Sequence, residues 1–258
     1  MTRGKLRYST TALLVAAILV CFAPLRAQTF VLDHVQLTEP DTSKAVDWYL
    51  KYIGGAKTRN SNEVAFGPTV FMFQQGNDAS PSAGSVIDHV GFSFPDLDAK
   101  VAEWQAAGVK ILTPVRDVPG LFKLGFIQDP WGVKIEVVQD PETLGFHHIH
   151  LRSTDPDAMF KWLNDTFGGD KTKLMGRLDG LKYGNVWVLV QKANEEPTPS
   201  AGHAIDHVGW RTASLATAAA ELKKNGAKFT TEPTTAGPLK VSFVEGPAGL
   251  RVEVLQRP

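Results

Sequence analysis

The chain repeats itself over a long period, and this repeat limits its fold more than any other feature of the sequence. Residues 88–91 read Asp-His-Val-Gly, and the same four residues stand at 206–209, 118 positions later. His34 and His148 form a second matching pair, 114 positions apart. Self-similarity at a fixed period indicates that one structural unit has been copied. We therefore expect the chain to fold as two similar modules.

The two modules are expected at residues 30–139 and 145–256, and each of them is itself double. Four short runs of alternating polarity are typical of strands, and each is followed by an amphipathic stretch that a glycine closes, as at a helix C-terminus. Two or three further strand-like runs follow each glycine. The four helices are expected to begin near Ser43, Leu97, Asp157 and Leu215. Units of this βαβββ kind predict an α+β architecture.

The first 27 residues have the layout of a secretory signal peptide. Three basic residues open the chain, an apolar run spans residues 12–23, and Ala27 is a small residue before a cleavage point at Gln28. The apolar run is shorter than the roughly 20 residues that a membrane-spanning helix needs. We expect an exported protein, periplasmic or secreted, with an uncleaved membrane anchor as the alternative.

Composition narrows the classes of partner and of ligand. Cys21 is the only cysteine and belongs to the expected leader, so the mature chain would have neither disulfide nor thiolate ligand. Four of the 27 basic residues and none of the 27 acidic residues lie in the leader, which leaves a mature net charge of −4. The sequence has no run of Lys or Arg that would release counterions from nucleic acid. We expect neither a nucleic-acid partner nor, after removal of the leader, a membrane partner.

Histidine and glutamate recur at matching positions of the two copies. Glu136 and Glu253 lie in apolar strands, where a carboxylate needs a partner such as a metal ion or a buried arginine. Two imidazoles and one carboxylate form a common ligand set for divalent metals and leave positions open for substrate. A single histidine at the start of a strand is more often an ordinary hydrogen-bonded residue, but both copies have the same three residue types, which favours a metal site. The six candidate ligands are His34, His89, Glu136, His148, His207 and Glu253.

Four such units resemble the vicinal oxygen chelate superfamily, which includes glyoxalase I, extradiol dioxygenases and bleomycin-binding proteins. The resemblance covers residues 30–256 and rests on the Asp-His-Val strand starts and on Asp-Pro-Trp-Gly at 129–132, four residues before Glu136. A parallel Gly-Pro-Ala-Gly at 246–249 precedes Glu253. It implies that two units close into a cup-shaped mixed sheet, with the helices outside and a divalent metal (Fe, Mn, Zn or Ni) within.

The resemblance leaves the grouping of the ligands open. By position, His34, His89 and Glu136 would bind one metal and the ligands of the second copy the other. The family also exchanges units between partners, so His34 would in that case join His207 and Glu253. The sequence decides neither this grouping nor whether the protein is a monomer or a homodimer.

Four positions depart from particular branches of the family. Similarity to glyoxalase I implies a fourth ligand at Met72 and Leu189, and neither side chain suits a hard divalent ion. Similarity to the extradiol dioxygenases implies a tyrosine at positions 126 and 243, where this chain has Phe126 and Phe243. A phenyl ring can neither donate a hydrogen bond to a reacting oxygen nor accept one from it. This argues against the ring-cleaving dioxygenase reaction.

We expect a metal-dependent enzyme of the glyoxalase-like lyase or isomerase type, in which a Lewis acid stabilises an oxyanion or enolate on a small chelating substrate. His150, on the face of its strand that carries His148, is the candidate general base. Arg152, like Arg211, would either clamp an anionic substrate or neutralise Glu253. The alternatives are a metal-free small-molecule binding or sequestration protein of the bleomycin-resistance type and a metal-dependent ring-cleaving dioxygenase.

Overall fold

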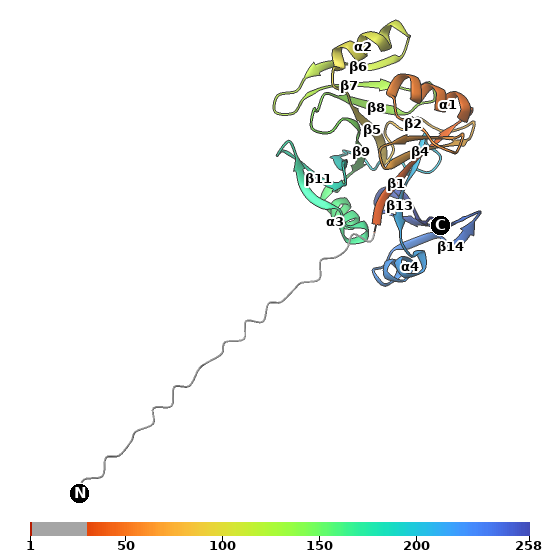
Figure 1. Ribbon diagram of the computed structural model, residues 1–258, viewed down its shortest axis with the longest axis vertical. Coiled ribbons are helices and arrows are strands. Elements are labelled where there is room, and N and C mark those ends of the chain that lie inside the picture. The colour runs from red at the N-terminus through yellow and green to blue at the C-terminus, as the bar shows by residue number, and fades with distance from the viewer. Residues whose placement is uncertain (2–29) are drawn as a thin grey trace.

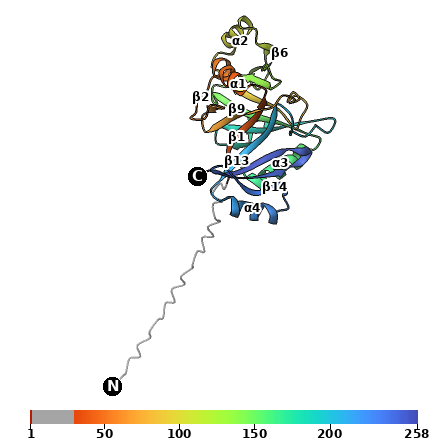
Figure 2. The same ribbon diagram turned by 90° about the vertical axis from the view of Figure 1, so that its right-hand side faces the viewer.

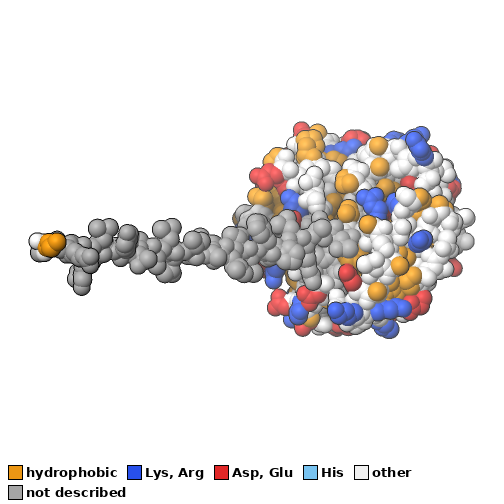
Figure 3. Space-filling view, turned by 60° about the horizontal axis from the view of Figure 1, so that its bottom comes forward, with side chains coloured by type: hydrophobic (Ala, Val, Ile, Leu, Met, Phe, Trp, Pro, Cys, Tyr) orange, Lys and Arg blue, Asp and Glu red, His pale blue; other side chains and the backbone are white. Residues whose placement is uncertain are grey.

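A computed structural model of the chain describes Met1 and residues 30–258 (Figure 1). The expected leader and its cleavage point at Gln28 therefore lie, apart from Met1, outside the described residues. Of the residues that are described, no helix is both long and apolar enough to span a membrane. Basic and acidic side chains are interspersed over the face of the molecule shown in Figure 3.

The described chain has four α-helices, one in each repeated unit. Each begins at its expected residue or one residue before it, because an Asp or Ser side chain immediately ahead accepts a hydrogen bond from a free N–H of the first turn. The first helix continues into one π-helical turn, Tyr49–Ile53. The helices are α1 (Thr42–Trp48), α2 (Leu97–Ala106), α3 (Pro156–Phe167) and α4 (Leu215–Lys224).

The strands form two eight-stranded mixed sheets. Sheet one has, in spatial order, β14 (Lys228–Ala236), β15 (Leu239–Glu245), β16 (Arg251–Gln256), β13 (Ile205–Thr212), β1 (Phe30–Glu39), β4 (Thr69–Gln75), β3 (Glu63–Phe66) and β2 (Ala56–Lys57). Sheet two has β10 (Asp170–Leu174), β11 (Leu178–Tyr183), β12 (Val186–Lys192), β9 (Gly145–Ser153), β5 (Ile87–Ser93), β8 (Lys134–Val138), β7 (Lys123–Gln128) and β6 (Lys110–Asp117). A single 3₁₀ turn, Pro247–Gly249, precedes β16.

The two halves of the chain exchange units to make these sheets. Sheet one joins the first and fourth units through the antiparallel pair β1 and β13, and sheet two joins the second and third units through β5 and β9. The last strand of each unit runs parallel to its first strand, as β4 does beside β1 and β16 beside β13. The fold is thus the expected α+β arrangement of two cup-shaped sheets, and neither sheet comes from one copy alone.

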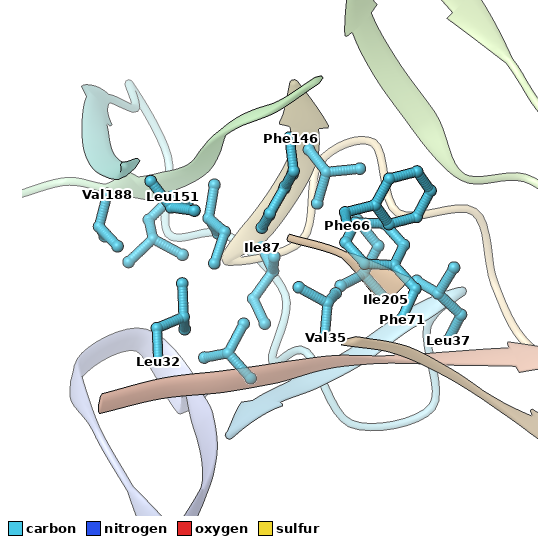
Figure 4. Close-up of a cluster of buried hydrophobic side chains, with 14 of the residues drawn as sticks. Leu32, Val35, Leu37, Phe66, Phe71, Ile87, Phe146, Leu151, Val188 and Ile205 are labelled. Carbon is cyan, nitrogen blue, oxygen red and sulfur yellow. The ribbon is translucent and has the colours of Figure 1, made fainter. Parts of the chain in front are cut away.

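The hydrophobic core lies between the two sheets, where their central strands meet (Figure 4). Val35 from β1 lies close to Ile87 from β5, and Leu37 from β1 and Ile205 from β13 belong to the same cluster; all four side chains are fully buried. Burying one such side chain stabilises the fold by about 1.5–3 kcal/mol. Because successive strand residues point to opposite faces, His34, which lies beside Val35, is directed away from this core and into the cup of sheet one.

One polar cluster lies inside the core at the end of β1. Tyr49 Oη donates to Asp129 Oδ2 at 3.1 Å, and Glu39 is fully buried beside that carboxyl. Among the described residues, neither carboxyl oxygen of Glu39 has a hydrogen-bond partner. Burial and the neighbouring Asp129 raise the pKa of Glu39 far above its usual range, so its carboxyl holds a proton at neutral pH. The second copy has Ser153 at the position of Glu39.

Replacing Glu39 by glutamine is expected to flatten the dependence of stability on pH. The folded protein holds a proton that the unfolded chain releases above pH 4.5, the ordinary pKa of glutamate, so the free energy of unfolding falls as pH rises from there. Such a group changes stability by about 1.4 kcal/mol per pH unit. Glu39→Gln removes this loss and should raise the melting temperature at pH 8. The exposed Glu195→Gln is the control, and parallel profiles for wild type and Glu39→Gln would show that Glu39 is ionised in the folded state.

Candidate metal centres

Three side chains converge inside the cup of sheet one, and we call this cluster site A. His34 comes from β1, His207 from β13 and Glu253 from β16. The Nε2 atoms of the two histidines lie 3.4 Å apart, and they lie 3.2 and 3.1 Å from Oε2 of Glu253. All three side chains are nearly buried. Site A therefore combines one residue of the first unit with two of the fourth.

Four side chains converge in the same way inside the cup of sheet two, and we call this cluster site B. His89 Nε2, His148 Nε2 and His150 Nδ1 lie 2.9, 3.2 and 3.9 Å from Oε2 of Glu136. The four ligand atoms all lie within 4.8 Å of one another. Site B has a fourth candidate ligand, His150, which site A lacks. The corresponding residue in sheet one is Gln36.

A glycine makes room for one histidine of each site. Gly209 lies opposite His34 across the β1–β13 pair, and a Cβ atom added to it would lie 2.1–2.7 Å from the imidazole ring. Gly91 lies opposite His148 in the same way, and its added Cβ would lie 2.0–2.5 Å from that ring. The glycine of each Asp-His-Val-Gly motif thus accommodates the histidine that the partner strand supplies.

The residue before the histidine fixes its orientation in three of the four units. Asp33, Asp88 and Asp206 each accept a hydrogen bond from Nδ1 of the histidine that follows, at 3.1, 2.6 and 2.7 Å. In a neutral imidazole, a carboxylate that accepts from Nδ1 leaves Nε2 without a hydrogen, as a metal-binding imidazole requires.

The ligand atoms fit a cation better than they fit one another. In the neutral imidazoles these Nε2 atoms are bare and face a carboxylate oxygen, so lone pairs point at each other at about 3 Å unless a metal ion or a proton lies between them. In the described chain, Nε2 of His148 and Nδ1 of His150 are buried without a hydrogen-bond partner. Buried polar atoms of this kind are rare and point to a missing partner. Imidazole nitrogen and carboxylate oxygen suit Fe, Mn, Zn and Ni.

The two glutamates and His148 are in the protonation states that metal binding requires. Burial opposes ionisation of Glu253, but the neighbouring His207 and His34 rings outweigh it and hold its pKa at about 2. Burial also opposes ionisation of Glu136, yet the three histidines of site B hold its pKa well below the usual range. Burial lowers the pKa of His148 to about 4, so this imidazole is neutral at pH 7 and its Nε2 lone pair is available to a metal. At His34, burial disfavours the charged ring, but its contacts with Asp33 and Glu253 outweigh burial and raise its pKa, so a proton competes with a metal ion there.

The structure brings all six candidate ligands into two clusters, and it decides how they are grouped. His34 lies with His207 and Glu253, as in the exchanged grouping. The grouping of His34 with His89 and Glu136 is wrong, because β1 pairs with β13 and not with β5. The corresponding grouping of the second copy, His148 with His207 and Glu253, is wrong for the same reason.

The two candidate catalytic residues lie in and beside site B. His150 is one of the four convergent side chains, so its Nδ1 could bind a metal ion or, when no metal is bound to it, act as a base. Arg152 Nη1 lies 3.5 Å from Asp88, and Arg211 Nη1 lies 3.8 Å from Asp33. The suggestion that either arginine neutralises Glu253 is wrong, since the partners of Glu253 in the described chain are its two histidines.

The cup walls contain the residues that depart from particular branches. The Phe126 and His89 rings lie 5.3 Å apart, and the Phe243 and His207 rings lie 5.1 Å apart. Leu189 neighbours His150 in the sheet, as Met72 neighbours Gln36. In the first cup, Gln36 Nε2 donates to the carbonyl oxygens of Leu37 and Met72.

Sequence reasoning missed the outer hydrogen-bond partners and the glycines. The signal was present, because an aspartate stands before three of the four histidines and a glycine stands two residues after two of them. Their roles emerge only when the strand pairing is known, since each glycine serves a histidine from the other half of the chain.

Two cups, each with histidines and a glutamate at its centre, define a class of protein built from tandem βαβββ units with candidate metal sites. The model of the Glyoxalase/Bleomycin resistance protein/Dioxygenase superfamily matches residues 31–137 and 145–254. The chain therefore belongs to this superfamily.

Solved structures share the whole fold at low sequence identity. Glyoxalase I from Zea mays is 18% identical, with a TM-score of 0.71, and the match covers 88% of this chain and 92% of that one. A putative dioxygenase from Bacillus subtilis is 14% identical, with a TM-score of 0.65, and the match covers 90% of this chain and 86% of that one. Similarity at this level shows a common fold. No curated protein sequence matches the chain.

Proposed function

We propose that this protein is a divalent-metal-dependent enzyme of the glyoxalase-like lyase or isomerase type. The observation that carries the proposal is the convergence of bare imidazole nitrogens on a carboxylate at the centre of both cups. A divalent ion bound there would act as a Lewis acid and stabilise an oxyanion or enolate on a small substrate that chelates it. Three protein ligands at site A would leave positions open for such a substrate.

The residues of the chain itself would bind and orient the substrate. The cup of sheet two contains Trp187 and Leu189 beside the histidines, and Gly180 on the neighbouring strand leaves space for both side chains. His150, with a side chain that is 18% exposed, is the histidine of site B that a substrate reaches most easily. It is the candidate for moving a proton to or from the substrate where it is not itself a ligand.

Two other functions make different predictions for the same sites. A metal-free binding protein of the bleomycin-resistance type would not need bare nitrogens to converge in both cups. A ring-cleaving dioxygenase would need a hydrogen-bonding group near the metal, and Phe126 and Phe243 stand at those places. The lyase or isomerase interpretation is therefore the one that we favour.

Protein purified without a chelator is expected to contain up to two divalent ions per chain. Removing them with EDTA should lower the melting temperature, because a ligand that binds only the folded state stabilises it. Returning the ion should restore the melting temperature. Elemental analysis and calorimetry measure both effects. Protein that is folded, free of metal and indifferent to added Mn²⁺, Fe²⁺, Ni²⁺ or Zn²⁺ would instead support the binding-protein function.

We also propose that the protein is exported, to the periplasm or out of the cell, and acts there on a small molecule as a monomer or homodimer. Support comes from the basic, apolar and small-residue pattern of the first 27 residues. Mass spectrometry of the exported protein should find an N-terminus at or near Gln28. An intact Met1 on the exported protein would contradict this.

A further inference from the structure

His148, the histidine that opens the third unit, has a different outer partner from the histidines that open the other three units. An aspartate stands before each of the others, but His147 stands before His148. His147 Nδ1 lies 2.8 Å from His148 Nδ1, and His147 Nε2 lies 3.1 Å from Asp140 Oδ2. His147 is fully buried and Asp140 nearly so. The His147 imidazole therefore lies between His148, a candidate metal ligand, and the nearest carboxylate, that of Asp140.

Comparison of the repeated units shows that the positions of His147 and Asp140 both hold different residues in the sheet of site A. In site A the corresponding pair is Asp33 and Arg257, whose guanidinium donates to both carboxylate oxygens at 3.0 and 2.6 Å. Asp33 corresponds to His147, and Arg257 corresponds to Asp140. Sheet one thus pairs an acid, Asp33, with a base, Arg257. At the same two positions, sheet two pairs a base, His147, with an acid, Asp140. Each pair also ties the start of one unit to the end of the unit that shares its sheet.

When both imidazoles are neutral, the hydrogen bonds admit one consistent arrangement of hydrogens. The Asp140 carboxylate only accepts, so His147 Nε2 carries a hydrogen and His147 Nδ1 is bare. His148 Nδ1 must then donate to it, which leaves His148 Nε2 bare and directed at Glu136. The opposite arrangement would set a bare His147 nitrogen against the carboxylate and place an N–H in site B.

We propose that His147, held by Asp140, is a positioning residue that fixes His148 with its Nε2 bare and directed into site B. This inference rests on the metal binding proposed above. Metal-ligating histidines commonly donate their second nitrogen to an outer partner, and loss of that partner weakens metal binding roughly 10–100-fold. The affinity of site B is thereby controlled by a pair of residues that site A does not have.

The hydrogen arrangement is tested without metal. Long-range ¹H–¹⁵N correlation spectra of protein labelled with ¹⁵N-histidine should show His148 as the Nδ1–H tautomer and His147 as the Nε2–H tautomer. A His148 that carries its hydrogen on Nε2 would overturn the proposal. This measurement uses the unaltered side chains of both residues, so it does not depend on whether a variant folds.

The affinity of site B is tested by Co²⁺ titration in a Glu253→Gln background, in which site A is disabled. His147→Leu should weaken Co²⁺ binding roughly 10–100-fold and shift the visible absorption of the bound ion. His147→Gln, whose amide can accept from His148 and donate to Asp140, should stay within about threefold of the unaltered site. The double change His147→Asp with Asp140→Arg, which copies the pair of site A, should do the same.

A control and the decisive outcomes complete the design. His203→Leu removes a histidine outside both sites and should leave Co²⁺ binding unchanged. A folded His147→Leu protein with unchanged Co²⁺ affinity would overturn the proposal, as would a His147→Gln protein that binds as weakly as His147→Leu. Unaltered protein that binds metal at neither site but shows the expected tautomers would contradict the proposed function and still support the positioning of His148.

Discussion

Replacing Glu253 by glutamine is expected to remove metal from site A while the fold survives. The amide keeps the shape of the side chain but takes away the one negative charge among the three ligand atoms. Loss of an outer partner already weakens metal binding roughly 10–100-fold, so loss of a direct anionic ligand should exceed 100-fold. Metal content should fall from two ions to one per chain.

The matched variant is Glu136→Gln, which should affect site B alone. Its effect should be smaller, because three histidines remain there. Elemental analysis and the melting temperature of both variants test the prediction. The contrary outcome is a loss of about 3–5 kcal/mol in stability with metal content unchanged, which would mean that the glutamate serves only as a buried ion-pair partner.

Gly209→Ala is expected to remove metal from site A although it changes no ligand. The added Cβ would lie 2.1 Å from the nearest atom of the His34 ring, a distance that no contact tolerates, so the ring must leave its place. The backbone of Gly209 is open to alanine, because its φ lies outside the left-handed range. Overpacking of this kind costs about 1–3 kcal/mol in stability.

Gly91→Ala is the counterpart that acts on His148 and therefore on site B. Metal analysis should show that each alanine empties only its own site. Because Gly209 and His34 come from opposite halves of the chain, this result would also verify the exchange of units in solution. If Gly209→Ala instead affected metal at site B, or at neither site, the strand pairing would be wrong.

The local structure of this chain could be predicted because local signals determine it. Aspartate or serine before each helix, and glycine after it, set the helix limits within about a residue at their N-termini. Alternating polarity placed the candidate ligands on one face of each strand, opposite the core residues such as Val35. These patterns involve residues close together in the sequence, so they would be the same whichever units paired.

The pairing of the units could not be predicted from those patterns. Either pairing, first with second or first with fourth, buries the same strand faces and brings two histidines to one glutamate. The choice depends on contacts between distant residues, such as Gly209 with His34 and Arg257 with Asp33. The inserted His147 was missed for the same reason, because its partner Asp140 lies in a segment that looked like a simple joint.

The exchange of units makes the chain equivalent to a dimer whose two subunits are joined by a tether. Residues 139–144 connect the halves, and each half supplies part of both sites. A covalent tether replaces a bimolecular encounter by an intramolecular one at a high effective concentration, in the millimolar range for short flexible linkers. A protease that cut there would leave each half without a complete metal site of its own, and metal binding would then depend on protein concentration. The continuity of one short segment therefore determines whether dilution can separate the candidate ligands of either site.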